Sequence, residues 1–164
     1  MSITGIGKTI FTEAQIQQRI ADVAKEINND YQDEELIVVS ILKGSIYFVA
    51  DLTRRLNMPL SIDFISIGIC PEGGKSSAVK ITKDLSFDLT GRNVLLAEDI
   101  IGTGLTLAYI YQHLEAFKPA SLKICTLLDN PAERLLKINI DYRCFSMPDT
   151  FVVGYGLDYN ELYR

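Results

Sequence analysis

The residues best suited to chemistry lie in one segment, 94–106, which reads VLLAEDIIGTGLT. Its apolar start predicts a buried strand that delivers two adjacent carboxylates, Glu98 and Asp99, to its carboxyl end. The loop that follows holds two glycines and two threonines and then opens a helix. Glycines let a backbone approach a ligand closely, and free N–H groups at a helix N-terminus favour a phosphate. Because carboxylates suit sugar hydroxyls or a hydrated Mg²⁺, the pattern indicates a sugar-phosphate site.

Two other nucleotide-binding motifs and a plain loop are alternatives to the sugar-phosphate site in this segment. The segment lacks the lysine of a P-loop and the third glycine of a dinucleotide-binding fold, so neither motif fits. Two glycines alone are a weak signal, and acidic residues at strand ends are often only solvated. On spacing alone, a phosphate site and a plain solvated loop both stay open.

Strands and helices alternate around this segment. Thr12 and Gln15 form a capping box before a helix whose apolar residues repeat as far as Ile27. Helices are also expected after Gly44 and after the glycine-containing loop, and 79–83 is expected to be the return strand of a hairpin. Short apolar runs predict the other strands at 36–42, 60–67, 94–97, 121–128 and 151–153. This order predicts an α/β fold with an open, mostly parallel sheet flanked by helices, in which ligands bind at the carboxyl ends of strands.

Composition narrows the class of protein. The chain has 164 residues, of which 48% are hydrophobic and 23% charged, as expected for a single globular domain. A net charge of -5 argues against a nucleic-acid partner. Three cysteines without a C-x-x-C pair and a single histidine predict neither a disulfide framework nor a zinc site. No signal peptide or membrane span is predicted, so we expect a cytoplasmic protein without a membrane partner.

The segment 94–106 resembles the phosphoribosyl pyrophosphate (PRPP) signature of type I phosphoribosyltransferases. Three more segments follow the order of that family. Residues 42–44 (LKG) resemble the pyrophosphate loop, 66–68 (SIG) the start of a flexible hood, and 151–161 (FVVGYGLDYNE) the segment that binds the purine base and a metal. Together they resemble the hypoxanthine-guanine phosphoribosyltransferases over essentially the whole chain.

The resemblance implies an activity and its partners. A 6-oxopurine, hypoxanthine or guanine, would react with PRPP in purine salvage to give IMP or GMP and pyrophosphate, with Mg²⁺ as cofactor. The chain, 1–164, would form one domain with a mobile hood around 66–84, whose polar excursion is Pro71–Ser77, and would assemble as a homodimer or homotetramer.

The resemblance also implies roles for individual residues. The ribose and its 5′-phosphate would bind to Glu98, Asp99, Ile100, Ile101, Thr103, Gly104, Leu105 and Thr106. The pyrophosphate would face Lys43, Gly44 and Arg164. The base would contact Asn130, Phe151, Val152 and Asp158, and the metal would lie near Glu98, Asp99 and Asp158.

Three positions depart from the family pattern. Gly102 stands where the family has the aspartate that accepts a proton from N7 of the purine, and a glycine cannot move a proton. Asn130 replaces a lysine that reaches the exocyclic oxygen of the base, and Ile67 replaces a hood tyrosine. Two functions therefore stay open: a purine phosphoribosyltransferase of ordinary or reduced efficiency, and a non-catalytic regulator that binds PRPP or a nucleotide. The retained pyrophosphate loop favours the enzyme.

Overall fold

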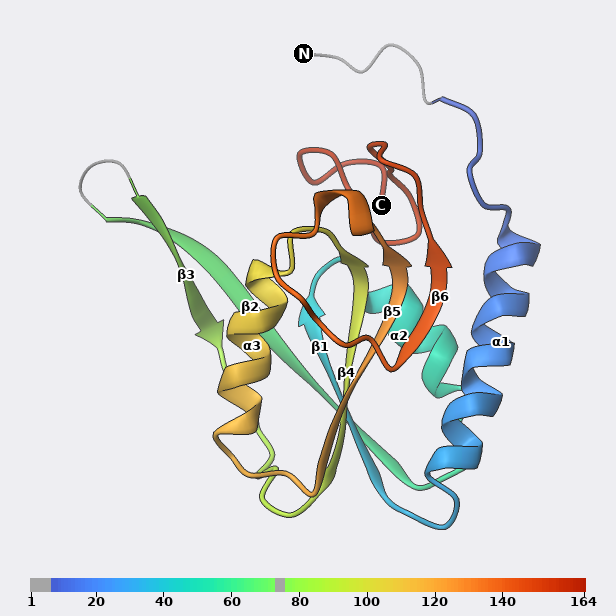
Figure 1. The fold of residues 1–164 in the computed structure, drawn as a ribbon, viewed down its shortest axis with the longest axis vertical. Coiled ribbons are helices and arrows are strands. Elements are labelled where there is room, and N and C mark those ends of the chain that lie inside the picture. Colours follow the sequence, from blue (N-terminus) through green and yellow to red (C-terminus); the bar gives the residue numbers. More distant parts are fainter. Residues whose placement is uncertain (1–6, 73–75) are drawn as a thin grey trace.

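A six-stranded sheet with the order β3-β2-β1-β4-β5-β6 runs through the centre of the protein (Figure 1). The computed structural model describes residues 7–72 and 76–164. Neighbouring strands are parallel except for the pair β2 and β3. The strands are β1 (Leu36–Leu42), β2 (Leu60–Glu72), β3 (Ser76–Lys83), β4 (Asn93–Ile101), β5 (Ser121–Asp129) and β6 (Tyr142–Ser146). The predicted α/β class and mostly parallel sheet are confirmed.

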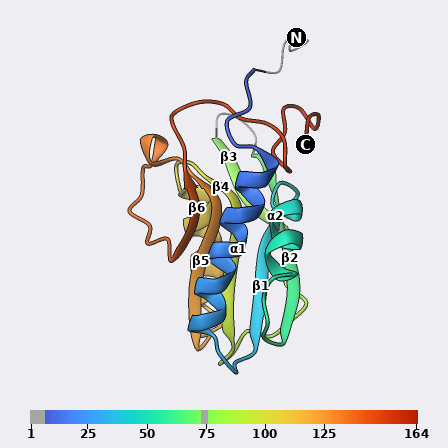
Figure 2. The same ribbon diagram turned by 90° about the vertical axis from the view of Figure 1, so that its right-hand side faces the viewer.

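Helices cover both faces of the sheet. The helices α1 (Glu13–Asp30) and α2 (Ile46–Thr53) pack side by side on one face, as Figure 2 shows, and α3 (Leu105–Glu115) packs on the other. The predicted capping box is present, because the backbone N–H of Gln15 donates to Thr12 and the Gln15 side chain accepts from the Thr12 N–H. A short 3₁₀ turn, η1 (Pro131–Glu133), follows β5.

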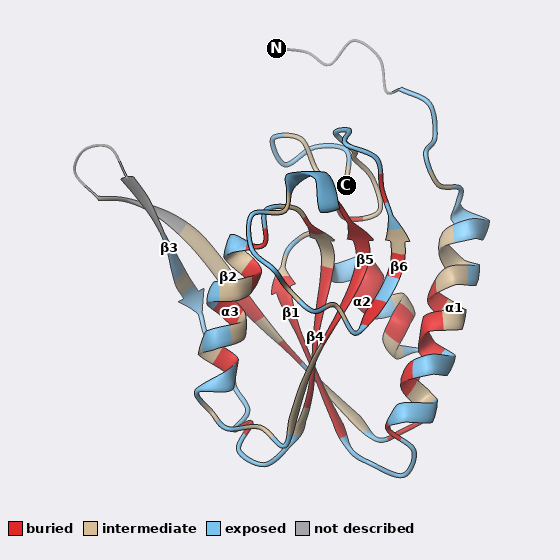
Figure 3. Cartoon of the chain, viewed as in Figure 1, coloured by how far each residue is buried: buried red, intermediate tan, exposed pale blue. Residues whose placement is uncertain are grey.

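Burial on both faces explains why the central strands have nearly continuous apolar sequences. In β1, Val38 packs into the core under α1 and α2, whereas Ile37 and Val39 pack into the core under α3. Figure 3 shows the same burial along β4 and β5. The few polar side chains buried within these strands, Ser40 and Thr126, donate to backbone carbonyls, and the charged side chains of the site lie where the strands end.

Two expectations about the sheet were wrong. The last strand is β6, Tyr142–Ser146, and not 151–153. The segment 151–153 instead leads into a turn in which Gly154 and Leu157 exchange backbone hydrogen bonds of 2.9 and 3.1 Å. Val152 is apolar because its side chain packs against the core, so its apolarity reports burial and not strand pairing.

The second error concerns the polar excursion at 71–77. The hairpin strands continue through most of it, since β2 extends to Glu72 and β3 begins at Ser76; residues 73–75 of this excursion lie outside the described residues. Beyond Ser66 the strand β2 no longer pairs with β1, so Pro71 needs no donor on that side. The hairpin projects away from the sheet in Figure 1, and its closure over a ligand stays a prediction. Within the described residues, no helix combines the length and the apolarity needed to cross a membrane.

Candidate active site

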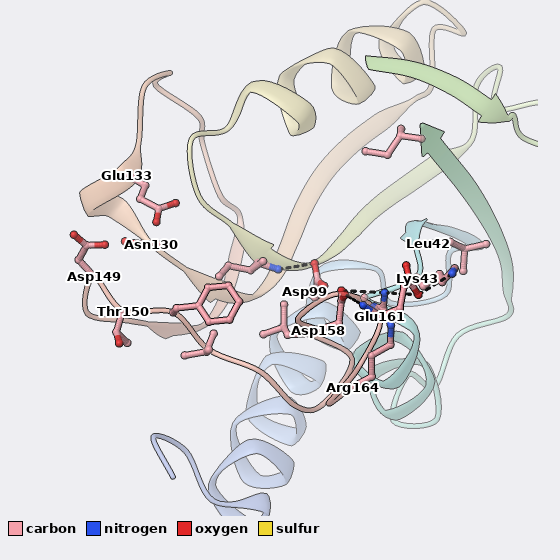
Figure 4. A pocket seen from close by; sticks show the side chains of 16 residues that line it. Leu42, Lys43, Asp99, Asn130, Glu133, Asp149, Thr150, Asp158, Glu161 and Arg164 are labelled. Atoms are coloured by element: carbon pink, nitrogen blue, oxygen red, sulfur yellow. Dashed lines mark hydrogen bonds and ion pairs between the residues drawn. The ribbon is translucent and has the colours of Figure 1, made fainter. Parts of the chain in front are cut away.

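A cavity of about 730 Å³ opens where β1, β4 and β5 end (Figure 4). Of the residues predicted for a site, it is lined by Lys43, Gly44, Ile67, Asp99, Ile100, Asn130, Phe151, Val152, Asp158 and Arg164. These residues come from β2, β4, the turns after β1 and β5, and the segment after β6. The structure thus brings five separated stretches of the sequence to one cavity.

Two glycines, Gly44 and Gly156, allow the turn after β1 to contact both the C-terminal segment and the end of β4. A Cβ placed on Gly156 would overlap the carbonyl oxygen of Gly44, and a Cβ on Gly44 would overlap Oδ2 of Asp99. Gly156 also has a φ of +103°, which L side chains rarely adopt. The backbone of Gly44 is therefore held between the C-terminal segment and the carboxylate at the end of β4.

The C-terminal segment places two cations at one end of the cavity. Nζ of Lys43 lies 2.9 Å from Oε2 of Glu161, and the guanidinium of Arg164 lies 2.9 Å from Oδ1 of Asp158 and 3.2 Å from Oε2 of Glu161. Arg164 also donates to the carbonyl of Gly156 at 2.8 Å. The hydrogen bonds from Lys43 and Arg164 lower the pKa of Glu161. Exposed pairs of this kind are weak, so an anionic ligand can replace Glu161 as the partner of both cations.

The two carboxylates at the end of β4 lie in different surroundings. Successive strand residues point to opposite faces, so Asp99 lines the cavity and Glu98 does not. Glu98 is only 7% exposed, and its Oε1 has no hydrogen-bond partner in the described part of the chain. Burial, and then the charge of Asp99, raise the pKa of Glu98 well above its usual range. The pKa of Asp99 is also raised, chiefly by burial and further by Asp158, although the Ile100 N–H and Arg164 favour its ionised form.

The loop between β4 and α3 has the form of an anion site but does not line this cavity. Gly104, with a φ of +84°, is the N-cap of α3 and offers no side chain to its first turn. The N–H groups of that turn have no acceptor within the helix; that of Leu105 donates to the Thr103 hydroxyl at 3.4 Å, and such groups at a helix N-terminus suit an anion. The loop is held from the far side by Leu135, whose N–H donates to the carbonyl of Thr103 at 3.0 Å. The predicted phosphate residues Ile101 and Thr103–Thr106 thus adjoin the cavity along β4 and α3.

At the opposite end of the cavity an aromatic ring lies near a buried amide. Phe151 is 71% exposed and meets Tyr159 edge to face, with ring centroids 6.0 Å apart. Asn130 is 2% exposed, and its Oδ1 has no hydrogen-bond partner among the residues described. A free aromatic face and an unpartnered amide suit a planar heterocycle with a polar edge.

Comparison with known proteins identifies the fold family. Residues 7–160 match the model of the phosphoribosyl transferase domain. The chain belongs to the phosphoribosyltransferase family. It is 40% identical over 166 residues to the hypoxanthine-guanine phosphoribosyltransferase of Mycobacterium avium, covering 97% of this chain and 82% of that one. It is 41% identical over 160 residues to the hypoxanthine phosphoribosyltransferase of Salmonella typhimurium, covering 96% and 90%.

Solved phosphoribosyltransferases have the same fold. A crystal structure of a hypoxanthine-guanine phosphoribosyltransferase from Bacillus anthracis superposes with a TM-score of 0.90 at 43% identity, covering 97% of this chain and 92% of that one. A hypoxanthine phosphoribosyltransferase from Staphylococcus aureus gives a TM-score of 0.90 at 40% identity, covering 99% and 91%. These similarities confirm the resemblance inferred from the four segments.

The residues of this phosphoribosyltransferase fit a magnesium ion that is bound together with a phosphorylated ligand. In the described ranges, 7–72 and 76–164, no three His, Cys, Asp or Glu side chains gather into an all-protein metal site. Mg²⁺ rarely needs one, since it keeps several waters and commonly uses one or two carboxylates together with substrate phosphates. Asp99 and Asp158 supply two carboxylates that line one cavity and raise each other's affinity for a cation. Glu98 faces away from the cavity in this structure, so its role toward a metal stays a prediction.

Sequence reasoning missed several acidic residues of the cavity. Glu133, Asp149 and Glu161 all line it. Glu161 was within the segment that resembles the purine and metal segment, and its spacing from Asp158 could have indicated the shared contact with Arg164. Glu133 and Asp149 follow β5 and β6, and the only signal for them was an acidic residue shortly after the carboxyl end of a strand.

The contact between Gly44 and Gly156 gives a prediction about stability. Gly156→Ala adds a methyl group that overlaps the Gly44 carbonyl, and it also forces a residue with a Cβ to a positive φ. Gly154→Ala is a matched control, because Gly154 has a φ of +96° but no atom within 4 Å of the added Cβ.

We expect Gly154→Ala to lower the free energy of unfolding by about 1–2 kcal/mol, the cost of the backbone conformation alone. Gly156→Ala should lose about 1–3 kcal/mol more, since overpacking adds to that cost. Urea denaturation of the three proteins measures both values. Equal losses in the two variants would contradict the close contact.

The buried carboxylate Asp99 gives a second prediction. The pKa of Asp99 is higher in the folded protein than in the unfolded chain. As pH rises between these two pKa values, the unfolded chain ionises first, so the free energy of unfolding falls. Asp99→Asn does not titrate and keeps an oxygen for the Ile100 N–H.

At pH 7 the Asp99→Asn variant should therefore be the more stable protein, by about 1.4 kcal/mol for each unit by which the pKa is raised. The difference should close below about pH 4, where the wild-type carboxyl is protonated in both states. Denaturation curves across this range measure it, with the exposed turn variant Asp33→Asn as control. A variant less stable than the wild type at pH 7 would refute the argument.

Proposed function

We propose that the protein transfers the 5-phosphoribosyl group of PRPP to a 6-oxopurine, hypoxanthine or guanine, and releases pyrophosphate. One observation carries the proposal: a single cavity joins an exposed aromatic ring with a buried amide, two cations, and carboxylates beside an anion-type loop. These features match the purine base, the ribose 5-phosphate and the pyrophosphate of the two substrates. Relatives named for this activity, at about 40% identity over nearly the whole chain, support the same substrates.

The base end recognises the purine. Phe151 offers its open face for stacking, and Asn130 offers an amide whose Nδ2–H can donate to the exocyclic oxygen of the base while its unpartnered Oδ1 can accept from a ring N–H. The backbone of Val152 lies beside the ring of Phe151 and can read the edge of the base. Asn130 is shorter than a lysine and carries no charge, so we expect it to discriminate less strongly between exocyclic groups.

The cationic end holds the leaving group. Lys43 and Arg164 exchange their contacts with Glu161 for contacts with pyrophosphate oxygens, and the Gly44 backbone lies close enough to donate its N–H. Bound with Asp99, Asp158 and the pyrophosphate, Mg²⁺ would neutralise charge on the leaving group. The N–H groups at the start of α3 and the Thr103 and Thr106 hydroxyls hold the 5′-phosphate. Because C1′ becomes cationic as its bond to pyrophosphate breaks, catalysis here consists mainly of positioning and electrostatic stabilisation.

The runner-up function is a regulator that binds PRPP or a nucleotide without turnover. The paired Lys43 and Arg164 oppose a regulator that binds only nucleotide, since it has no use for a pyrophosphate contact, whereas a regulator that binds PRPP is distinguished by the absence of turnover. We further propose a homodimer or homotetramer, which sedimentation velocity would reveal.

The activity is tested by incubating the protein with PRPP, Mg²⁺ and one base at a time: hypoxanthine, guanine, xanthine or adenine. We expect IMP and GMP with stoichiometric pyrophosphate, and less product from the other two bases. Chelation of the metal should stop the reaction. Binding of IMP without any turnover would instead favour the regulator.

Stacking on Phe151 predicts a loss of nucleotide affinity in Phe151→Ala. The loss of one aromatic face should weaken IMP binding by about 1–3 kcal/mol in isothermal titration. Phe151→Tyr keeps the face and should bind IMP as the wild type does. Phe87→Ala is the control, because Phe87 is also an exposed phenylalanine, at 43%, but does not line the cavity. Unchanged affinity in Phe151→Ala would place the base elsewhere.

A further inference from the structure

The space that a side chain at position 102 would occupy is filled by a carboxylate from another element. A Cβ built on Gly102 would lie 2.6 Å from Oε2 of Glu133 and 3.8 Å from its Cδ. Gly102 lies in the loop after β4, and Glu133 is the last residue of η1, which follows β5. We propose that Glu133 is the group that accepts the purine proton in this protein, a role that Gly102 cannot fill; this inference rests on the proposed function.

The turn that carries Glu133 is fastened to the Gly102 loop on both sides. Before it, the N–H of Asn130 donates to the carbonyl of Ile101 at 3.0 Å. After it, the guanidinium of Arg134 donates to the carbonyls of Gly102 and Ile101 at 2.8 and 2.9 Å and binds Asp129. Arg134 thus directs Nε and Nη2 to the backbone and to Asp129, and among the described residues no ion pair joins it to Glu133, which lies close to Gly102.

Elimination among the acidic residues of the cavity also points to Glu133. Asp99 packs against Gly44 and accepts from the Ile100 N–H, whereas Asp158 and Glu161 are paired with cations. Within the described part of the chain, Glu133 and Asp149 are the two cavity carboxylates that have neither a hydrogen bond nor an ion pair. Of these two, Glu133 lies against the loop that leads from the ribose-binding carboxylate to the phosphate site.

Figure 4 shows the position of Glu133 relative to the other groups. Glu133 and Asn130 lie at the same end of the cavity, Asp158 and Arg164 lie at the other end, and Asp99 lies between them. A purine that stacks on Phe151 with its exocyclic oxygen toward Asn130 therefore has Glu133 on the same side. The exocyclic oxygen of a 6-oxopurine is flanked by N1 on one side and by N7 on the other, and N7 belongs to the same five-membered ring as N9. Because N9 must point toward the ribose and the loop after β4, we place the N7 edge on the side of Gly102, where the Glu133 carboxylate lies.

N9 of the purine forms a bond to C1′ of PRPP while the bond between C1′ and the pyrophosphate oxygen breaks, and the pyrophosphate leaves with the electron pair. The base then carries an excess proton on N7, and this proton passes to a carboxylate oxygen of Glu133. In the reverse reaction the protonated Glu133 returns it. No other reactant is needed.

The test measures the chemical step by rapid quench under single-turnover conditions, with hypoxanthine, PRPP and Mg²⁺, because product release can hide chemistry in steady-state rates. Glu133→Gln keeps the size of the side chain and removes the proton acceptor. We expect the chemical step to slow by about 10²–10⁴-fold, the usual contribution of a general base. The Kd for IMP should stay within about threefold, less than 1 kcal/mol.

Two restorations separate a catalytic role from a structural one. Moving the carboxylate to the other element, in the double variant Gly102→Asp with Glu133→Ala, should recover much of the rate that Glu133→Ala loses. Added formate should accelerate Glu133→Ala but not Glu133→Gln, whose amide still fills the space. Glu35→Gln, an exposed pair of Arg92 before β1, is the control and should match the wild type.

The possible results have distinct meanings. A wild-type rate of chemistry in Glu133→Gln overturns the proposal, and a rate lost in Asp149→Asn instead transfers the role to Asp149. Loss of rate together with IMP affinity, with no restoration by the double variant or by formate, also overturns it, since Glu133 would then only support the turn. If the wild-type protein itself forms no nucleotide from any base, it is the proposed function that fails, and the role of Glu133 fails with it.

Discussion

The contact between the backbones of Gly44 and Gly156 is the constraint on which the rest of the site depends. Neither residue has a side chain, so the turn after β1 can lie directly between the C-terminal segment and Asp99. This contact brings Lys43 next to Glu161 and lets Arg164 reach Asp158. A larger residue at either glycine would overlap the neighbouring segment and disturb this arrangement of cations and carboxylates.

The charged groups of the cavity are arranged for ligand binding at a cost to the stability of the folded protein. Burial raises the pKa values of Glu98 and Asp99, so the folded chain holds carboxyl groups where ionisation is unfavourable. On the other side, Lys43 and Arg164 are paired with exposed carboxylates that a pyrophosphate can replace. A polyanionic substrate bound with Mg²⁺ would suit this arrangement, since Asp99 would help to hold the metal and Lys43 and Arg164 would contact the phosphates.

The relation between Gly102 and Glu133 shows that a chemical role belongs to a point in space and not to a position in the sequence. A carboxylate can reach the same point from the loop after β4 or from the turn after β5, because these strands are neighbours in the sheet and their carboxyl ends adjoin. The longer glutamate side chain spans the additional distance. Arg134 holds the two loops together, and this bracing makes the position of Glu133 reproducible.

The sequence by itself determined the elements whose signals are local. The capping box at Thr12, the apolar runs of β1, β4 and β5, and the carboxylates and glycines of 94–106 each depend on neighbours only a few residues away. These signals, together with the resemblance of four segments, were enough to predict the fold class and most of the residues that line the cavity.

Only the tertiary structure decided features that depend on contacts between distant residues. One such feature is the last strand of the sheet, because β6 and not 151–153 pairs with β5. Another is the choice between the two carboxylates of β4: Asp99 lines the cavity and Glu98 does not. The same is true of Glu133, which lies 31 positions after Gly102 in the sequence but fills the space beside it. Periodicity reports which face of an element is buried, but it does not report which side chain from another element will share that space, and the chemistry of this site depends on that sharing.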